Sequence, residues 1–321
     1  MMTIRPGHIL LAFSASVLLL SSCGGKGGKA LSRRTFPPLP QVPSVLTGQS
    51  ERGAYLADHF WDAFLSGSYP CDSFLVNGVP AEDVESALGR FVTIIETACD
   101  RPQAMRSMEG FFKKVNDFQT QNPSSGVYGF FEEKVAKYLF DPNSPVRDED
   151  LYLPYLKGLL SSSLTPGERK PAYTRDAAMC SLNQVGTVAA DISFTCLDGK
   201  KRTLRGINAD HILLLFTNPG CQSCEEVISS LTASGRIGER VRTGSLAVVN
   251  LYIDLEVDKW IAMAKSYPET WINGYDQDHE IRTDLTYCVR AIPSMYVLDR
   301  DKRVVMKDAP AGKVIPFIEN I

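Results

Sequence analysis

The chain has 321 residues, which is enough for about two domains. With 44% hydrophobic and 22% charged residues, its composition is typical of a globular protein and not of a disordered one. The formal net charge of −3 gives no basic surface for nucleic acid or anionic lipid, so we expect no nucleic-acid partner.

The first 23 residues look like the signal peptide of a bacterial lipoprotein. Arg5 lies in a short basic region, and the apolar stretch over residues 9–20 is too short to span a bilayer. Small residues then precede Cys23, as in a lipobox. The resemblance implies cleavage before Cys23, lipidation of its thiol and anchoring to a membrane. The alternative is an ordinary signal peptide with an incidental cysteine.

Residues 24–47 are predicted to form a tether. Glycine and lysine come first, and a group of prolines follows at Pro37, Pro38, Pro40 and Pro43. Such density of proline favours extended chain without a core, so this segment would hold the folded part away from the membrane.

Residues 48–183 are predicted to form a small all-α domain. Apolar residues recur at helical spacing in the stretches 55–65, 84–95, 108–118 and 131–139, and a further helix is expected over 149–160. We predict a bundle of about five helices whose aromatic residues pack the core and do not line a ligand groove. One more helix is expected over 165–183, with Thr165 as its N-cap and Pro166 in its first turn.

Residues 184–321 change to a pattern of strands and helices. Ile192, Phe194 and Cys196 alternate with polar residues before the hairpin signal Asp198-Gly199. Apolar runs predict strands over 212–215, 246–253, 294–298 and 303–306, and amphipathic patterns predict helices over 256–267 and 311–319. The order predicts an α/β domain with a central sheet.

Cys221 and Cys224 form a Cys-x-x-Cys motif where the buried strand turns into a helix. A helix N-terminus offers unpaired N–H groups and a partial positive charge, and both stabilise a thiolate. Two cysteines on one helical turn can also close a disulfide and reopen it. The motif is therefore suited to thiol–disulfide exchange.

Two other interpretations of the motif are a zinc site and an inert structural disulfide. Zinc needs two more ligands, and neither a second Cys-x-x-Cys nor a histidine at ligand spacing is present among His59, His211 and His279. We predict no metal and no cofactor. The remaining cysteines, after Cys23, are Cys71, Cys99, Cys180, Cys196 and Cys288; a Cys71–Cys99 disulfide is possible, and spacing alone settles no pairing among them.

The stretch from Val185 onward resembles an exported thioredoxin-like domain of the TlpA/ResA type. The resemblance rests on Asp191-Ile192-Ser193-Phe194 with Asp198-Gly199, on Cys221-x-x-Cys224 after a strand, on the segment 271–275, and on Ala291-Ile292-Pro293 before a strand. The helical segment is similar to an uncharacterised domain that precedes such folds in Bacteroidetes-type lipoproteins.

This resemblance implies roles for four residues. Cys221 would attack, Cys224 would resolve, and Pro293 would be a cis-proline packed against the disulfide. The Ile292 backbone would then be presented to a substrate strand beside Cys221. We interpret Cys288 as an ordinary buried cysteine, and we place Tyr275 and His279 in a solvated loop.

The chain departs from the family pattern around the motif. Gly220 stands where many relatives have tryptophan, and Ser223 where many have proline. These differences leave the redox poise open, so reductase, isomerase and oxidant are all compatible with the motif.

Acidic residues are also missing where the family has them. Leu215 replaces the buried acid of thioredoxins, and Val227 replaces the acid of the ResA type. Glu225 and Glu226 are close, but their helical offsets face elsewhere. The base that would deprotonate Cys224 is therefore unassigned.

The leading hypothesis is a lipid-anchored thiol–disulfide oxidoreductase of a Gram-negative cell envelope that faces the periplasm. Its substrate would be a disulfide-containing envelope protein, and an unknown membrane donor would supply electrons. The competing hypothesis is a binding or scaffold lipoprotein with a structural thioredoxin fold. A peroxidase is disfavoured, because Leu214 and Asn218 occupy the positions of the peroxiredoxin proline and hydroxyl residue.

Overall fold

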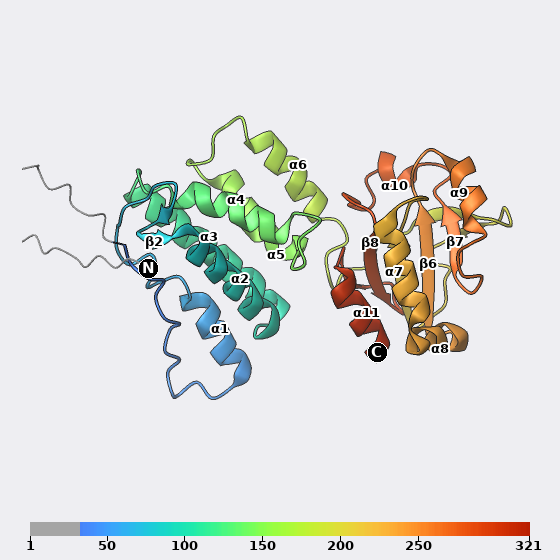
Figure 1. Ribbon diagram of the computed structural model, residues 1–321, viewed down its shortest axis with the longest axis horizontal. Helices are drawn as coiled ribbons and strands as arrows, with labels where there is room; N and C mark the ends of the chain where they lie inside the picture. Colours follow the sequence, from blue (N-terminus) through green and yellow to red (C-terminus); the bar gives the residue numbers. More distant parts are fainter. Residues whose placement is uncertain (1–32) are drawn as a thin grey trace, which may run out of the picture.

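A computed structural model describes residues 33–321. Figure 1 shows two parts side by side, a bundle of helices from the earlier residues and a sheet covered by helices from the later ones. Cys23, the predicted signal peptide and the start of the predicted tether lie outside the described residues. Within residues 33–321, no helix has the length and apolar character needed to cross a bilayer.

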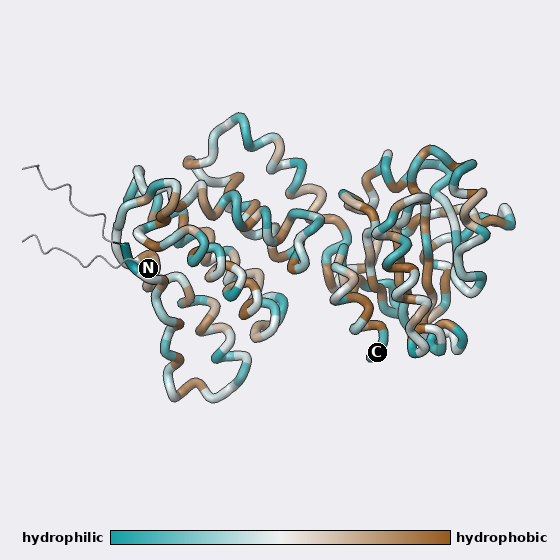
Figure 2. The backbone as a smooth tube through the Cα atoms, viewed as in Figure 1, coloured by the Kyte–Doolittle hydropathy of each residue, from teal (hydrophilic) through white to brown (hydrophobic). Residues whose placement is uncertain are grey.

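The predicted helical bundle is confirmed. It contains α1 (Gln49–His59), α2 (Ala81–Thr97), α3 (Arg101–Gln121), α4 (Val127–Leu139) and α5 (Glu149–Ser161). Aspartates begin two of these helices: the side chains of Asp100 and Asp148 accept backbone N–H bonds at 2.8 and 3.0 Å. Figure 2 shows hydrophobic and hydrophilic residues alternating along the helices, as expected for helices that bury one side.

Aromatic side chains fill the core of the bundle, as predicted. Trp61 stacks on Phe111 with ring centroids 4.8 Å apart, and Phe131 meets both rings edge-on at 4.9 and 5.0 Å. All three are 2% exposed or less. Offset and edge-on contacts of this kind add to the stability that burial of the rings already provides.

Two local features of this part differ from the prediction. A two-stranded hairpin, β1 (Leu75–Val76) and β2 (Val79–Pro80), precedes α2. The last helix, α6 (Lys170–Cys180), is shorter than expected and begins after a turn. Thr165 does not cap it, because the Thr165 hydroxyl is buried against the hydroxyl of Tyr128 at 2.6 Å.

The sheet has the order β4-β3-β7-β6-β5-β8-β9. Its strands are β3 (Ser193–Cys196), β4 (Lys201–Thr203), β5 (His211–Phe216), β6 (Leu246–Tyr252), β7 (Ile272–Tyr275), β8 (Ser294–Asp299) and β9 (Val304–Met306). The central strands β5, β6 and β7 are parallel, and β8 runs antiparallel to β5. Tyr275 therefore belongs to a strand, where it packs on Trp260, and the prediction of a solvated loop was wrong for it.

Helices cover the sheet because its strands are apolar on both faces. Along β5, Ile212 and Leu214 point into one apolar cluster, while Leu213 and Leu215 point into the other. The covering helices are α7 (Gln222–Ala233), α8 (Gly235–Thr243), α9 (Val257–Ala264), α10 (Glu280–Thr283) and α11 (Ala311–Asn320). Strand β5 is thus buried on both sides, and its carboxyl end is held rigidly.

Charged residues lie buried where the two parts meet. Glu149, in the first turn of α5, is 2% exposed, and its carboxylate lies 2.9 Å from Arg290 and 3.3 Å from Lys307. Lys307 also donates to the Cys180 carbonyl, at the end of α6, at 2.6 Å. An anion at the start of one helix and a cation at the end of another both complement the helix dipoles.

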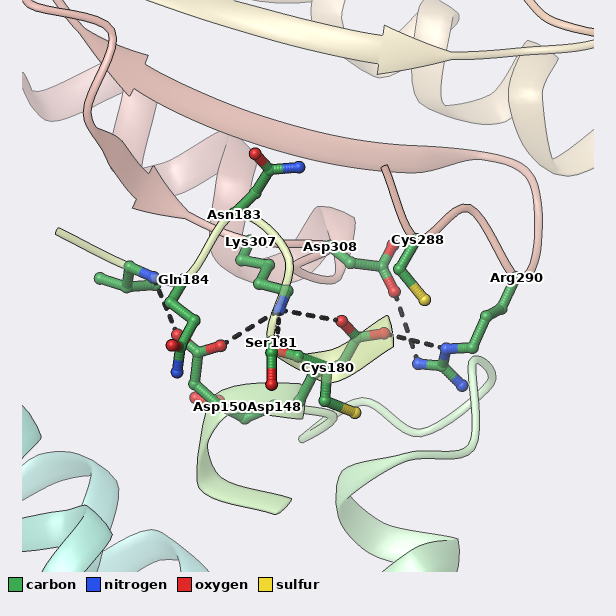
Figure 3. Close-up of polar contacts among 12 residues, drawn as sticks. Asp148, Asp150, Cys180, Ser181, Asn183, Gln184, Cys288, Arg290, Lys307 and Asp308 are labelled. Carbon is green, nitrogen blue, oxygen red and sulfur yellow. Dashed lines mark hydrogen bonds and ion pairs between the residues drawn. The ribbon is translucent and has the colours of Figure 1, made fainter. Parts of the chain in front are cut away.

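Asp308 completes this interface (Figure 3). Ser294 donates to its carboxylate at 2.7 Å, and the Nε atom of Arg147 donates to its backbone carbonyl at 2.8 Å and lies 3.3 Å from its carboxylate. Burial raises the pKa of Asp308 to about 6, and the negative charge of Glu149 acts in the same direction, whereas the guanidinium of Arg147 opposes the shift.

A substitution at Gly53 tests the close packing of α1 against the end of α2. A Cβ atom at this position would lie 2.0 Å from the Ala98 carbonyl oxygen. We expect Gly53→Ala to lower the free energy of unfolding by about 1–3 kcal/mol, because backbone must move. The control is Gly110→Ala inside α3, where nothing lies within 4 Å and where alanine should add about 0.5–1 kcal/mol. Urea unfolding followed by circular dichroism measures both, and equal effects would contradict this packing.

Asp308 should make stability depend on pH. Because its pKa is raised from 3.8 to about 6 in the folded protein, the folded state binds this proton more tightly than the unfolded state. Its contribution to stability is therefore full below pH 4 and is lost as the pH rises through about 6. Asparagine in the variant Asp308→Asn does not titrate, so that variant does not lose stability at this position as the pH rises. We expect its stability relative to the wild type to increase by about 2 kcal/mol from pH 4 to pH 7, measured by urea unfolding; a constant difference across this range would contradict it.

Candidate active site

The Cys-x-x-Cys motif lies at the carboxyl end of the central strand. β5 ends at Phe216, residues 217–220 form a short loop, and Cys221 is the N-cap of α7. Since β5 is flanked by β6 and β8, the strands on both sides fix the position of this loop. The local sequence therefore fixes both sulfur atoms at the carboxyl end of β5.

Cys221 and Cys224 form a disulfide, with Cα atoms 5.2 Å apart. Cys221 is half-buried, whereas Cys224 is only 1% exposed, so a partner can reach the sulfur of Cys221 alone. The N–H of Cys224 lies in the first turn of α7 and donates to the Sγ atom of Cys221 at 3.2 Å. In the reduced protein the same N–H and the helix dipole would stabilise a Cys221 thiolate.

The Ile292–Pro293 segment lies beside the disulfide. The Ile292–Pro293 peptide bond is cis, and the Ile292 carbonyl oxygen is 3.9 Å from the Sγ atom of Cys221. β8 begins directly after Pro293 and pairs with β5. The fold thus brings together the four residues that the family resemblance singled out, from segments about 70 residues apart.

Gly220 has a structural reason to be glycine. Its backbone φ is +73°, in the left-handed region that residues with a side chain rarely adopt. The turn before Cys221 therefore requires glycine, and no bulky side chain shields the disulfide from that position.

Uncharged groups occupy the positions where the family resemblance led us to expect a buried acid. Leu215 is fully buried and apolar, and the residue paired with it on β6 is Asn250. The Asn250 side chain accepts the hydroxyl hydrogen of Thr217 at 2.6 Å and donates to Asn273 at 3.1 Å. Val227 is also buried, whereas Glu225 and Glu226 are exposed. The structure thus offers no buried carboxylate at these positions as a base for Cys224.

A polar group not anticipated from the sequence borders the loop. The Asn218 side chain donates to Asp254, which is also ion-paired with Arg282 from α10. The Asn218 backbone carbonyl accepts the N–H of Cys221 at 3.3 Å. These side chains link the turn that holds Cys221 to the end of β6, and nothing in the local sequence pairs them.

The other described cysteines are free thiols. The possible Cys71–Cys99 disulfide is not formed. Cys288 is fully buried, and burial raises its pKa to about 12, so the prediction of an ordinary buried cysteine is confirmed. Burial likewise raises the pKa of Cys180. No group of three or more metal-binding side chains occurs among residues 33–321.

Comparisons with known proteins cover both parts of the chain. Residues 23–180 match the family model described as Domain of unknown function (DUF5106). A crystal structure of a thioredoxin-like protein from Bacteroides caccae is 28% identical, covers 88% of this chain and 97% of that chain, and superposes with a TM-score of 0.74. No curated protein matches the sequence.

Further structures match the sheet part alone. The C-terminal domain of an uncharacterized protein from Bacteroides fragilis is 38% identical and covers 42% of this chain and 97% of that chain, with a TM-score of 0.41. The thioredoxin domain of a thiol-disulfide oxidoreductase from Bacteroides vulgatus is 19% identical and covers 42% and 98%, with a TM-score of 0.37. The match that spans both parts, together with the sheet topology, shows that the chain has a thioredoxin-like fold preceded by a helical domain.

Proposed function

We propose that the protein is a thiol–disulfide oxidoreductase that acts on disulfides of partner proteins. The observation that carries this proposal is the position of Cys221. Its sulfur is the reachable one of a closed pair, it caps a helix, and it lies 3.9 Å from the Ile292 carbonyl oxygen. An inert structural disulfide needs none of these three features.

The reaction follows from the difference in burial between the two cysteines. The Cys221 thiolate attacks one sulfur of a partner disulfide, which breaks that bond and forms a mixed disulfide. The partner's other sulfur leaves as a thiolate and takes a proton from water. The buried Cys224, once deprotonated, then attacks the Cys221 sulfur, restores the internal disulfide and releases the partner's second thiolate. The partner gains two electrons from the Cys221–Cys224 pair, and a membrane dithiol donor must then supply two more electrons to reduce this pair again.

The partner is held as an extended segment. The backbone of Ile292 lies beside the attacking sulfur and belongs to no helix or strand, so a partner strand can pair with it as in β-addition. A site of this kind recognises backbone more than side chains. We therefore propose unfolded or misfolded envelope proteins with disulfides as the substrate class, and reduction as the direction.

The location proposed for this reaction is the periplasmic side of a Gram-negative cell envelope. The lipobox-like residues before Cys23 support a lipid anchor, and the proline-rich stretch over residues 24–47 supports a tether between anchor and domain. An oxidising compartment outside the cytoplasm also supplies disulfides as substrates.

One observation favours a second candidate, a binding protein whose thioredoxin fold is structural. Leu215 and Val227 stand where a buried acid would assist Cys224, and the groups near Leu215 are neutral amides and a hydroxyl. Without a base, resolution by Cys224 would be slow, and the pair would serve stability more than turnover.

Single cysteine variants separate the two candidates. With insulin as a disulfide substrate, Cys221→Ser should lower the rate of reduction by at least about 100-fold, because the nucleophile is lost. Cys224→Ser should instead trap a mixed disulfide that is visible on a non-reducing gel. The matched control is Cys99→Ser, a half-buried thiol in the helical part, which should behave as the wild type. If the wild type does not reduce insulin and the Cys224→Ser variant forms no mixed disulfide, the result supports the binding protein instead.

A further inference from the structure

The segment that carries Ile292 and Pro293 is not held by regular structure. Residues 284–293 form neither helix nor strand. Outside the helices and strands, none of the backbone hydrogen bonds of the described residues involves residues 289–293. The position of the Ile292 backbone beside Cys221 therefore depends on its link to β8 and on side-chain contacts.

Arg290 is the side chain that anchors this segment. Its Nε atom donates to Glu149 at 2.9 Å, its Nη1 atom donates to the carbonyl oxygen of Phe140, and its guanidinium lies 3.9 Å from the centre of the Phe140 ring. Its side chain is only 17% exposed. Both partners belong to the helical domain, so a residue of the redox site's own loop is held from outside the thioredoxin fold.

Loss of this anchor is costly because the charges are buried. The side chain of Glu149 is 1% exposed, and its counter-charges are Arg290 and Lys307. A buried carboxylate that loses a cationic partner is left with uncompensated charge, which is costly. Arginine suits this place because its planar fork reaches the carboxylate, the carbonyl oxygen and the ring at once.

The other side of Pro293 is tied to the same interface. Ser294 follows Pro293 and donates to Asp308, and Asp308 accepts a bond from Arg147 of the helical domain. Figure 3 shows Arg290, Asp308 and Lys307 within this one interface. The helical domain therefore holds the Ile292–Pro293 segment at both of its ends.

We propose that Arg290 is a positioning residue through which the helical domain shapes the substrate-binding segment of the redox site. The proposal rests on the proposed function, and it assigns a role to the helical domain in that function. Arg290 holds the Ile292 backbone for a partner protein and leaves the chemistry of the sulfur atoms untouched. Recognition of a protein disulfide therefore depends on the docked helical domain, whereas reaction with a small disulfide does not.

Arg290→Gln in the full chain tests this proposal with two measurements. The first is the rate at which a thiol reagent labels Cys288, which is fully buried two residues before Arg290. The second is a comparison of the KM for insulin with the rate on a small disulfide, oxidised glutathione. The control is Lys313→Gln, which breaks a different ion pair between the two parts, Lys313 with Glu96.

In Arg290→Gln we expect Cys288 to be labelled at least about tenfold faster, because the segment opens locally. The buried Cys196, in β3, serves as an internal reference and should keep its wild-type rate. The KM for insulin should rise about tenfold while the rate on glutathione disulfide changes less than about twofold. Lys313→Gln should change none of these quantities. Arg290→Lys keeps the positive charge but lacks the planar guanidinium. Its labelling rate of Cys288 and its KM for insulin should lie between those of Arg290→Gln and the wild type.

Several results would overturn the proposal. If Cys288 is labelled no faster in Arg290→Gln than in the wild type, or if the labelling rate of Cys196 rises equally, Arg290 does not hold this segment locally. If Cys288 opens but the KM for insulin does not change, the segment does not govern recognition. If the wild type turns over neither disulfide, the oxidoreductase function fails, and labelling of Cys288 alone then decides whether Arg290 positions the segment.

Discussion

The carboxylate of Glu149 is the charge around which the two halves of the protein are joined. It lies in the first turn of α5, is almost inaccessible to water, and is matched by Arg290 and Lys307 from the thioredoxin-like domain. A buried ion pair adds little to stability compared with apolar packing, but removal of one partner is costly. Such a contact therefore specifies a single docking geometry. In this chain that geometry also fixes the loop next to the disulfide.

The redox site combines local and long-range elements. The strand β5, the glycine turn and the first turn of α7 place Cys221 from contiguous sequence. The Ile292 backbone arrives from a segment about 70 residues later and is held by a side chain that reaches the helical domain. In the proposed function, partner recognition and sulfur chemistry would rest on different parts of the molecule, so that one could be altered without the other.

The sequence predicted those elements that are determined by residues close together in the chain. The buried strands β5, β6 and β8 and the cysteine pair followed from apolar runs and from spacing. The hairpin at β1 and β2 was missed although Asn77-Gly78, both at positive φ, is a typical hairpin signal, because its strands have only two residues each. The strand β7 and the helix α8 were missed as well, since β7 has four residues and α8 has nine, few of them apolar.

Contacts between distant residues could not be predicted. Arg290 and Glu149 are 141 residues apart, and neither has a neighbouring residue that hints at the other. The same holds for Asn218 with Asp254, and for Thr217 with Asn250, because such pairs depend on how strands and domains meet in space. The departures from the family motif were visible in the sequence, but only the structure shows that Gly220 is required by its turn and that neutral groups lie near Leu215.

The reduction potential of the Cys221–Cys224 disulfide tests most directly whether this site performs exchange. The wild-type protein, equilibrated in glutathione or dithiothreitol buffers, should show a reversible two-electron couple within about −270 to −120 mV, the range of known exchange proteins. It should stay folded in both states, as judged by circular dichroism. A disulfide that is reduced only when the domain unfolds, or a dithiol that never reoxidises, would contradict a catalytic role for this cysteine pair.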